Sequence, residues 1–150
     1  MSPELRALYQ EVLIDHAKRP RNFCELAGAV SVEGYNPLCG DRIRLYVRRD
    51  DGQLREISFT GSGCAISTAS ASMMTEALKG KSVAEAEALA ERFQRLVTAP
   101  MDAAVDEEGL GKLAIFAGVR EFPVRVKCAT LAWHSLRSAL HGDKAVVSTE

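Results

Sequence analysis

The sequence predicts an α+β fold in which helices cover one face of a small antiparallel sheet of three strands. Strand-like segments lie between residues 30 and 59, helical periodicity follows as far as residue 142, and the link between the second and third strands is short. Strands grouped before helices are typical of the α+β class, and so short a link requires antiparallel neighbours. The 150 residues, 47% of them apolar and 26% charged, fit one globular domain over residues 1–150 and exclude a disordered chain.

The three strands are marked by alternation and by a turn. Residues 30–32 begin a short strand, and in residues 43–47 apolar side chains alternate with arginine and tyrosine, as in a strand with one face in water. Asp51-Gly52 is typical of a tight turn, and residues 57–59 mark the returning strand.

Two helices are predicted on either side of the sheet segments. The first begins near Pro3, ends before Pro20, and carries at helical spacing Leu5, Leu8, Tyr9, Val12, Leu13 and His16. The second covers residues 65–78, which are rich in alanine and serine and follow a Gly-Ser-Gly turn.

The rest of the chain is predicted to be helical. Ser82 and Glu85 form a capping box at the start of a helix that continues to Val97. A short apolar helix is expected over residues 110–118. A last helix over residues 123–142 opens on a proline and ends at a glycine.

Composition excludes several classes of partner. With 19 basic and 20 acidic side chains the formal charge is −1, which argues against nucleic acid because phosphate neutralisation needs a basic excess. The longest apolar stretch, residues 113–119, is far shorter than the about 20 residues that cross a membrane. The amino terminus carries Glu4 and no apolar signal segment. We therefore expect a cytoplasmic, reducing location, where cysteines are more often buried thiols, metal ligands or catalytic groups than disulfides.

Three of the four cysteines lie at the edges of predicted elements. Cys39-Gly40-Asp41 precedes a strand, where residues two apart project to the same side. Cys64 lies at a strand-to-helix junction, and a helix amino terminus stabilises a thiolate. Cys128 lies on the apolar face of the last helix and is preceded by two basic residues. Each motif by itself is equally consistent with a tight turn or a buried free cysteine.

Taken together, three thiols and one carboxylate match a tetrahedral zinc site in ligand type and number, with Asp41 in place of the usual fourth Cys or His. Coordination would deprotonate all three thiols and leave the site anionic, a charge that Arg125 and Lys127 would partly offset. Such a sulfur-rich site without an open water position suits sulfur chemistry better than hydrolysis.

The chain resembles the IscU/NifU family of iron–sulfur cluster assembly proteins in three motifs that follow the family's order. They are residues 36–41 (Asn-Pro-Leu-Cys-Gly-Asp), residues 61–75 (Gly-Ser-Gly-Cys-Ala-Ile-Ser, then Ala-Ser-Ala-Ser-Met-Met-Thr after a threonine) and residues 127–133 (Lys-Cys-Ala-Thr-Leu-Ala-Trp). The likeness covers nearly the whole chain. It points to the SufU-type branch, because Lys127 stands where IscU-type members have a histidine and because the interval from Cys64 to Cys128 is longer than theirs.

The resemblance implies a SufE/NifU-like fold and a Zn²⁺ ion bound by Cys39, Asp41, Cys64 and Cys128. It also implies that Cys39 accepts sulfane sulfur from a PLP-dependent cysteine desulfurase of the SufS type, once the desulfurase offers the zinc a replacement ligand. Sulfur would then pass to downstream iron–sulfur assembly components or apo-proteins. A zinc-bound thiolate is protected, whereas a released one attacks a persulfide by sulfur exchange. The sequence leaves open whether such a sulfurtransferase-like carrier is an enzyme.

Other functions use the same residues. One alternative is a scaffold that builds a transient [2Fe–2S] or similar cluster on Cys39, Cys64 and Cys128 and transfers it to apo-proteins. Another is a module in which zinc only stabilises the fold. A zinc hydrolase is disfavoured, because the sequence has no HExxH-type helix.

The remaining cysteine, two histidines and several arginines have simpler interpretations. Cys24 lies outside the motifs and is expected to be half-buried and without a role. His134 and His141 fall on a solvated helix face. On one face of the central strand lie Arg42, Arg44 and Arg48, which either solvate the sheet or dock an acidic partner surface.

Overall fold

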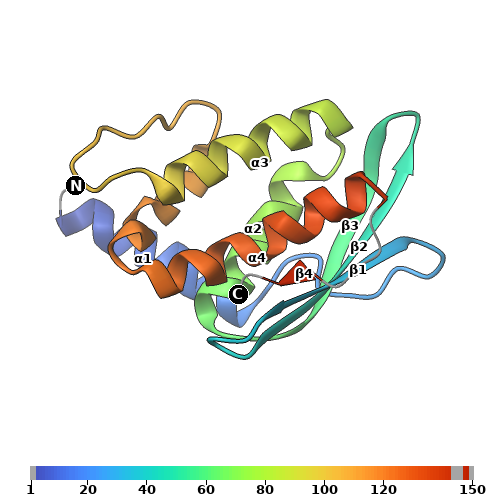
Figure 1. Ribbon diagram of the computed structural model, residues 1–150, viewed down its shortest axis with the longest axis horizontal. Coiled ribbons are helices and arrows are strands. Elements are labelled where there is room, and N and C mark those ends of the chain that lie inside the picture. Colours follow the sequence, from blue (N-terminus) through green and yellow to red (C-terminus); the bar gives the residue numbers. More distant parts are fainter. Residues whose placement is uncertain (1–2, 143–146, 149–150) are drawn as a thin grey trace.

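The computed structural model describes residues 3–142 and 147–148 and shows the α+β fold that the sequence predicts (Figure 1). In chain order the elements are α1 (Pro3–Lys18), β1 (Val30–Asn36), β2 (Asp41–Asp50), β3 (Gln53–Ser62), α2 (Ala65–Leu78), α3 (Val83–Thr98), the 3₁₀ helix η1 (Gly111–Glu121), α4 (Pro123–Leu140) and β4 (Val147–Ser148). Helix α4 packs against β1 and β2, and α2 packs against β3. Helices α1, α3 and η1 lie farther from the sheet and pack on α2 and α4.

The sheet has four strands in the order β3-β2-β1-β4, not the three predicted. The pairs β1–β2 and β2–β3 are antiparallel as predicted. The extra strand, β4, runs parallel to β1 and pairs Val147 with Gly34. Two residues are too few to show the alternation that identifies a strand, so β4 is defined by its partner and not by its own pattern.

The turn between β2 and β3 is the one that the Asp-Gly pair predicts. Asp51 has a φ of 55° and Gly52 a φ of 73°. Both residues therefore adopt the left-handed conformation that a tight hairpin turn of this kind requires.

The helices begin and end close to their predicted positions. The Ser82 hydroxyl accepts from the Glu85 backbone N–H, and the Glu85 carboxylate accepts from Ser82, so the predicted capping box is present. The predicted short apolar helix is a 3₁₀ helix that starts and ends slightly later. In the first helix Tyr9 packs against the core as predicted, whereas Leu8 is 53% exposed and does not belong to the buried stripe.

A chain of contacts sets the register between α2 and α4. Trp133 of α4 stacks on Phe93 of α3 at 4.6 Å between ring centroids, and its indole N–H donates to the Ser70 hydroxyl of α2 at 3.2 Å. The same hydroxyl donates to the backbone carbonyl of Ala129 at 2.6 Å. Because Ala129 follows Cys128, these contacts also fix the position of Cys128 relative to α2.

Among the helices of the described residues, none combines the length and the apolar character that crossing a membrane requires.

His16, the last residue of the first helix's apolar stripe, is buried and 2% exposed. Its Nδ1 lies 2.7 Å from the hydroxyl of Ser72, which also accepts from the backbone N–H of Arg21 at 2.8 Å. Burial lowers the pKa of His16, with the nearby positive charge of Arg21 acting in the same direction. His16 is therefore neutral in the folded protein under conditions in which an exposed histidine begins to take up a proton.

We expect this burial to make the folded state sensitive to acid. As pH falls through about 6.5, the unfolded chain gains a proton on His16 that the folded protein does not take up, so the free energy of unfolding decreases. The stability advantage of the wild-type protein over His16→Gln should therefore shrink between about pH 7.5 and 5.5. Urea denaturation of both proteins across this range measures the difference, and parallel pH profiles would contradict the expectation.

Candidate metal centre

Three of the four predicted ligands, Cys39, Asp41 and Cys128, come together where the β1–β2 hairpin meets the amino-terminal half of α4, and Cys64 at the start of α2 lies beside Asp41. The Sγ atoms of Cys39 and Cys128 and a carboxylate oxygen of Asp41 lie within 4.8 Å of one another. The two sulfurs are 3.1 Å apart, and Sγ of Cys64 lies 3.9 Å from Oδ2 of Asp41. All four cysteines of the described chain are free thiols.

The β1–β2 hairpin positions two of the four side chains. Asn36 ends β1 and pairs with Asp41, which begins β2. Residues 37–40 form the turn between them, and Gly40 has a φ of 69°, a left-handed conformation that glycine adopts without strain. Asp41 is thus held by the sheet, while Cys39 is half-buried on the turn.

The carboxylate of Asp41 is fully buried and hydrogen-bonded on both oxygens. Oδ1 accepts from the backbone N–H of Cys64 at 2.7 Å, and Oδ2 accepts from Nδ2 of Asn36 at 3.0 Å. Gly63 leaves the space that this arrangement needs, because a Cβ at that position would lie 2.6 Å from Oδ1. The β1–β2 hairpin and the start of α2, which are distant in sequence, therefore both donate hydrogen bonds to one carboxylate.

Cys64 is the N-cap residue of α2, as its place at a strand-to-helix junction predicts. Its Sγ accepts from the backbone N–H of Ser67 at 3.4 Å.

Cys128 is fully buried on α4. Burial, followed by hydrogen bonds to Cys39 and Cys64, raises the pKa of the Cys128 thiol well above its ordinary value. A hydrogen bond with Cys128, followed by the negative charge that Cys64, Cys128 and Cys39 would carry as thiolates, raises the pKa of the Arg125 guanidinium. In the absence of a metal Cys128 is therefore a neutral thiol, and Arg125 is the cation that faces the cluster.

The donor set fits a Zn²⁺ ion. Zinc–sulfur bonds of about 2.3 Å place tetrahedral ligand atoms about 3.8 Å apart, and the separations of 3.1 and 3.9 Å lie on either side of that value. None of the ion pairs in the described part of the chain includes Asp41. A buried carboxylate without a cationic partner is costly, and a metal ion bound by these residues would supply the missing positive charge.

Two residues that support the cluster were not assigned a role from the sequence. Asn36 is part of the first motif, but nothing in its spacing indicates that its side chain points toward Cys128. Gly63 is part of the second motif, and its role depends on the approach of Asp41 from another strand. Both roles depend on contacts between distant segments.

The burial of the residues outside the motifs differs in part from what the sequence predicts. Cys24 is exposed and not half-buried. His134 is half-buried, and burial lowers its pKa, so the predicted solvated face is wrong for this residue. His141 is exposed as predicted, with Nε2 2.7 Å from the Glu87 carboxylate.

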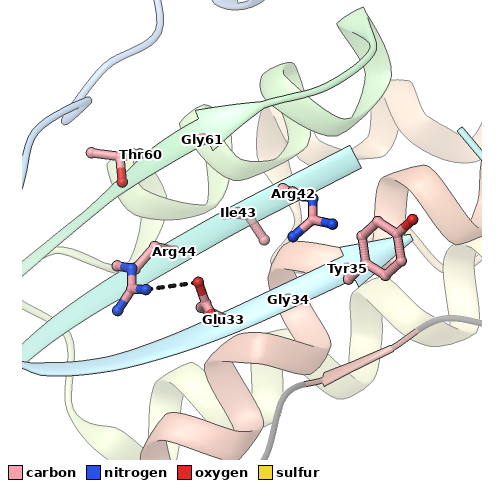
Figure 2. Close-up of a pocket in the computed structure, with 8 residues that line it drawn as sticks. All are labelled: Glu33, Gly34, Tyr35, Arg42, Ile43, Arg44, Thr60 and Gly61. Carbon is pink, nitrogen blue, oxygen red and sulfur yellow. Dashed lines mark hydrogen bonds and ion pairs between the residues drawn. The ribbon is translucent and has the colours of Figure 1, made fainter. Parts of the chain in front are cut away.

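The outer face of the sheet carries the predicted arginines, and two of them, Arg42 and Arg44, line a hollow of about 210 Å³ (Figure 2). Arg44 forms an ion pair with Glu33 at 2.7 Å, and Arg48 forms one with Glu56 at 2.9 Å. The guanidinium of Arg42 lies 4.6 Å from the ring centroid of Tyr35. Two of the three arginines are thus paired with glutamates of neighbouring strands. This agrees with the interpretation that these side chains solvate the sheet.

Comparison with known proteins identifies the family of the chain. The family model of the NifU-like N terminal domain matches residues 8–129. The chain belongs to this family. It is 47% identical to the iron–sulfur cluster assembly scaffold protein IscU of Streptococcus pyogenes serotype M1, over 91% of this chain and 85% of that protein. It is 42% identical to the zinc-dependent sulfurtransferase SufU of Bacillus subtilis, over 91% of both chains.

A solved structure also matches the fold. It is the crystal structure of a putative iron–sulfur cluster assembly scaffold protein for the SUF system from Fervidobacterium islandicum, with a TM-score of 0.81 and 32% identity. The match covers 93% of this chain and 99% of that one. The predicted family is confirmed, and proteins of the predicted SufU-type branch are among its relatives.

Gly63→Ala tests the packing around Asp41. The φ angle of Gly63 lies outside the left-handed region, so alanine brings no backbone strain there, only a methyl group against Oδ1. Displacing the carboxylate should weaken zinc binding by about tenfold or more, as measured by competition with a chromophoric chelator.

The control is Gly118→Ala, where an added Cβ meets no atom within 4 Å. It should bind zinc like the wild-type protein. Equal affinities of the two variants would show that the close approach of Gly63 to Asp41 has no effect on metal binding.

Proposed function

We propose that this protein is a zinc-dependent sulfur carrier of iron–sulfur cluster assembly, with Cys39, Asp41, Cys64 and Cys128 as zinc ligands. The single observation that carries the proposal is that the Cys39 and Cys128 sulfurs and the buried carboxylate of Asp41 meet within 4.8 Å, with the Cys64 sulfur next to Asp41. The name of the Bacillus subtilis relative, a zinc-dependent sulfurtransferase, supports it. The cytoplasmic location stays a prediction.

Cys39 is the thiol best placed to accept sulfur. Cys64 caps α2 and Cys128 is buried within α4, so both are fixed by helices. Cys39 lies on the turn of residues 37–40 and is half-buried. A turn can move a thiol outward without disturbing a helix, so Cys39 is the residue that can reach a partner.

The transfer itself is a sulfur exchange between cysteines. The Cys39 thiolate attacks the outer sulfur of a persulfide on a PLP-dependent cysteine desulfurase, a new S–S bond forms on Cys39, and the partner's cysteine leaves as a thiolate. No net oxidation occurs, because one S–S bond replaces another. When bound, Zn²⁺ would keep the thiols deprotonated at neutral pH. Arg125, which faces the three thiols, would stabilise the negative charge that the transfer moves through the site.

Exposed apolar side chains surround this end of the molecule. Leu38 next to Cys39 is 58% exposed, and Phe122 and Val124 at the start of α4 are 57% and 49% exposed. Large exposed apolar side chains next to a reactive group are typical of an interaction site. We infer that the desulfurase docks here, with Cys39 at the centre of the contact.

Cys39→Ala should abolish persulfide formation on this protein and its stimulation of a cysteine desulfurase, because the accepting sulfur is absent. Mass spectrometry of the protein after incubation with desulfurase and cysteine, together with sulfide release, measures both. The matched control is Cys24→Ala, which removes an exposed thiol outside the cluster and should behave like the wild type. Continued sulfur transfer by Cys39→Ala would contradict the proposal.

A scaffold function is the second candidate, favoured by the name of the relative from Streptococcus pyogenes. In this case Cys39, Cys64 and Cys128 would ligate a transient [2Fe–2S] or similar cluster. Metal content and absorbance separate the candidates. We expect the purified protein to be colourless, with one zinc ion per chain. Brown protein that transfers a cluster to an apo-protein would support the scaffold instead, and zinc without any effect on a desulfurase would indicate a structural module.

A further inference from the structure

Asn36 is the buried polar side chain whose contacts the proposed function does not explain. It ends β1 and is 0% exposed. Its Nδ2 lies 3.0 Å from Oδ2 of Asp41 and 3.4 Å from Sγ of Cys128. Both hydrogens of this one amide group are therefore directed at candidate ligands.

The other half of the amide has no partner. Among the described residues Asn36 Oδ1 is a buried side-chain atom without a hydrogen bond. The reverse orientation of the amide would place this oxygen against the carboxylate of Asp41, where two acceptors repel, so the amide orientation follows from its surroundings. An unpartnered buried acceptor destabilises a fold. The fold alone therefore gives no reason for an asparagine here, whereas the two hydrogen bonds from Nδ2 do.

We propose that Asn36 is a positioning residue that clamps Asp41 and Cys128 together and thereby raises the metal affinity of the site. This inference rests on the proposed zinc site. Groups that donate hydrogen bonds to metal ligands orient them and tune the metal, and their loss typically lowers metal affinity by about 10- to 100-fold.

The clamp also divides the site into two parts. Asp41 is held by Asn36 and by the backbone of Cys64, and Cys128 is held by Asn36 and by its helix. Both N–H bonds of the Asn36 amide are used on these two residues, and neither is directed at Cys39. Asn36 therefore fixes the ligands that stay in place and leaves free the residue that accepts sulfur.

The variant that tests this inference is Asn36→Leu, which keeps the branched shape and the number of heavy atoms of the side chain and removes both the donor and the unpartnered oxygen. Zinc affinity should fall by about 10- to 100-fold in a competition with a chromophoric chelator. The thermal stability of the metal-free protein should fall as well, because the buried carboxylate of Asp41 loses one of its two hydrogen bonds. With Co²⁺ in place of zinc, the sulfur-to-cobalt absorption bands should shift, because the Cys128 sulfur has lost its hydrogen bond.

Ser58→Ala is the matched control. It removes a buried side-chain hydrogen bond, to the Cys24 carbonyl, away from the cluster, and should lower stability without changing zinc affinity or the cobalt spectrum. If Asn36→Leu binds zinc within about twofold of the wild type and gives the wild-type cobalt spectrum, the inference is wrong. Should Asn36→Leu fail to fold, Asn36→Ala is tested by the same affinity and spectrum, with the same outcome overturning the inference.

These measurements use metal binding and not sulfur transfer. A wild-type protein that binds zinc but accepts no sulfur would overturn the proposed carrier function and leave the clamp intact. Wild-type zinc affinity in Asn36→Leu, together with Cys39-dependent transfer, would overturn only the clamp.

Discussion

A buried carboxylate organises this end of the molecule. Asp41 is fully enclosed, and a buried negative charge is tolerated only where it is hydrogen-bonded and close to positive charge. The hydrogen bonds come from the backbone of Cys64 and the side chain of Asn36. Because these donors belong to different segments, the hairpin and the start of α2 must meet at one place before the carboxylate can be buried. That meeting brings Cys39 and Cys64 to the carboxylate of Asp41.

The rest of the fold holds this meeting point in place. The antiparallel pairing of β1 with β2 sets Asn36 opposite Asp41. The Ser70 hydroxyl, shared between the carbonyl of Ala129 and the indole of Trp133, fixes α4 against α2. Cys128 thereby reaches the same small volume as Cys64, although 64 positions separate the two in the sequence. The hydrophobic core therefore determines the geometry of a polar site at its edge.

Local chemistry explains what could be predicted from the sequence. The Asp51-Gly52 turn, the capping box of Ser82 and Glu85, and the alternation in β2 depend only on near neighbours, and all three are present. The gathering of Cys39, Asp41, Cys64 and Cys128 was predicted from ligand types and a family resemblance, and not from contacts. What could not be predicted depends on tertiary contacts. The short strand β4 exists only through its pairing with β1, and the exposure of Leu8 depends on which face of α1 meets α2.

The four candidate ligands differ in how firmly the fold holds them. In the proposed carrier, a thiol that both binds a metal and accepts sulfur needs freedom to move, whereas its neighbours need to stay where the core has put them. Cys64 and Cys128 are built into helices, and Asp41 is held by two N–H donors that do not depend on a metal. Cys39 alone is attached to a turn, beside a glycine in a left-handed conformation. Three fixed donors and one movable thiol form a site that can release one ligand without losing its shape.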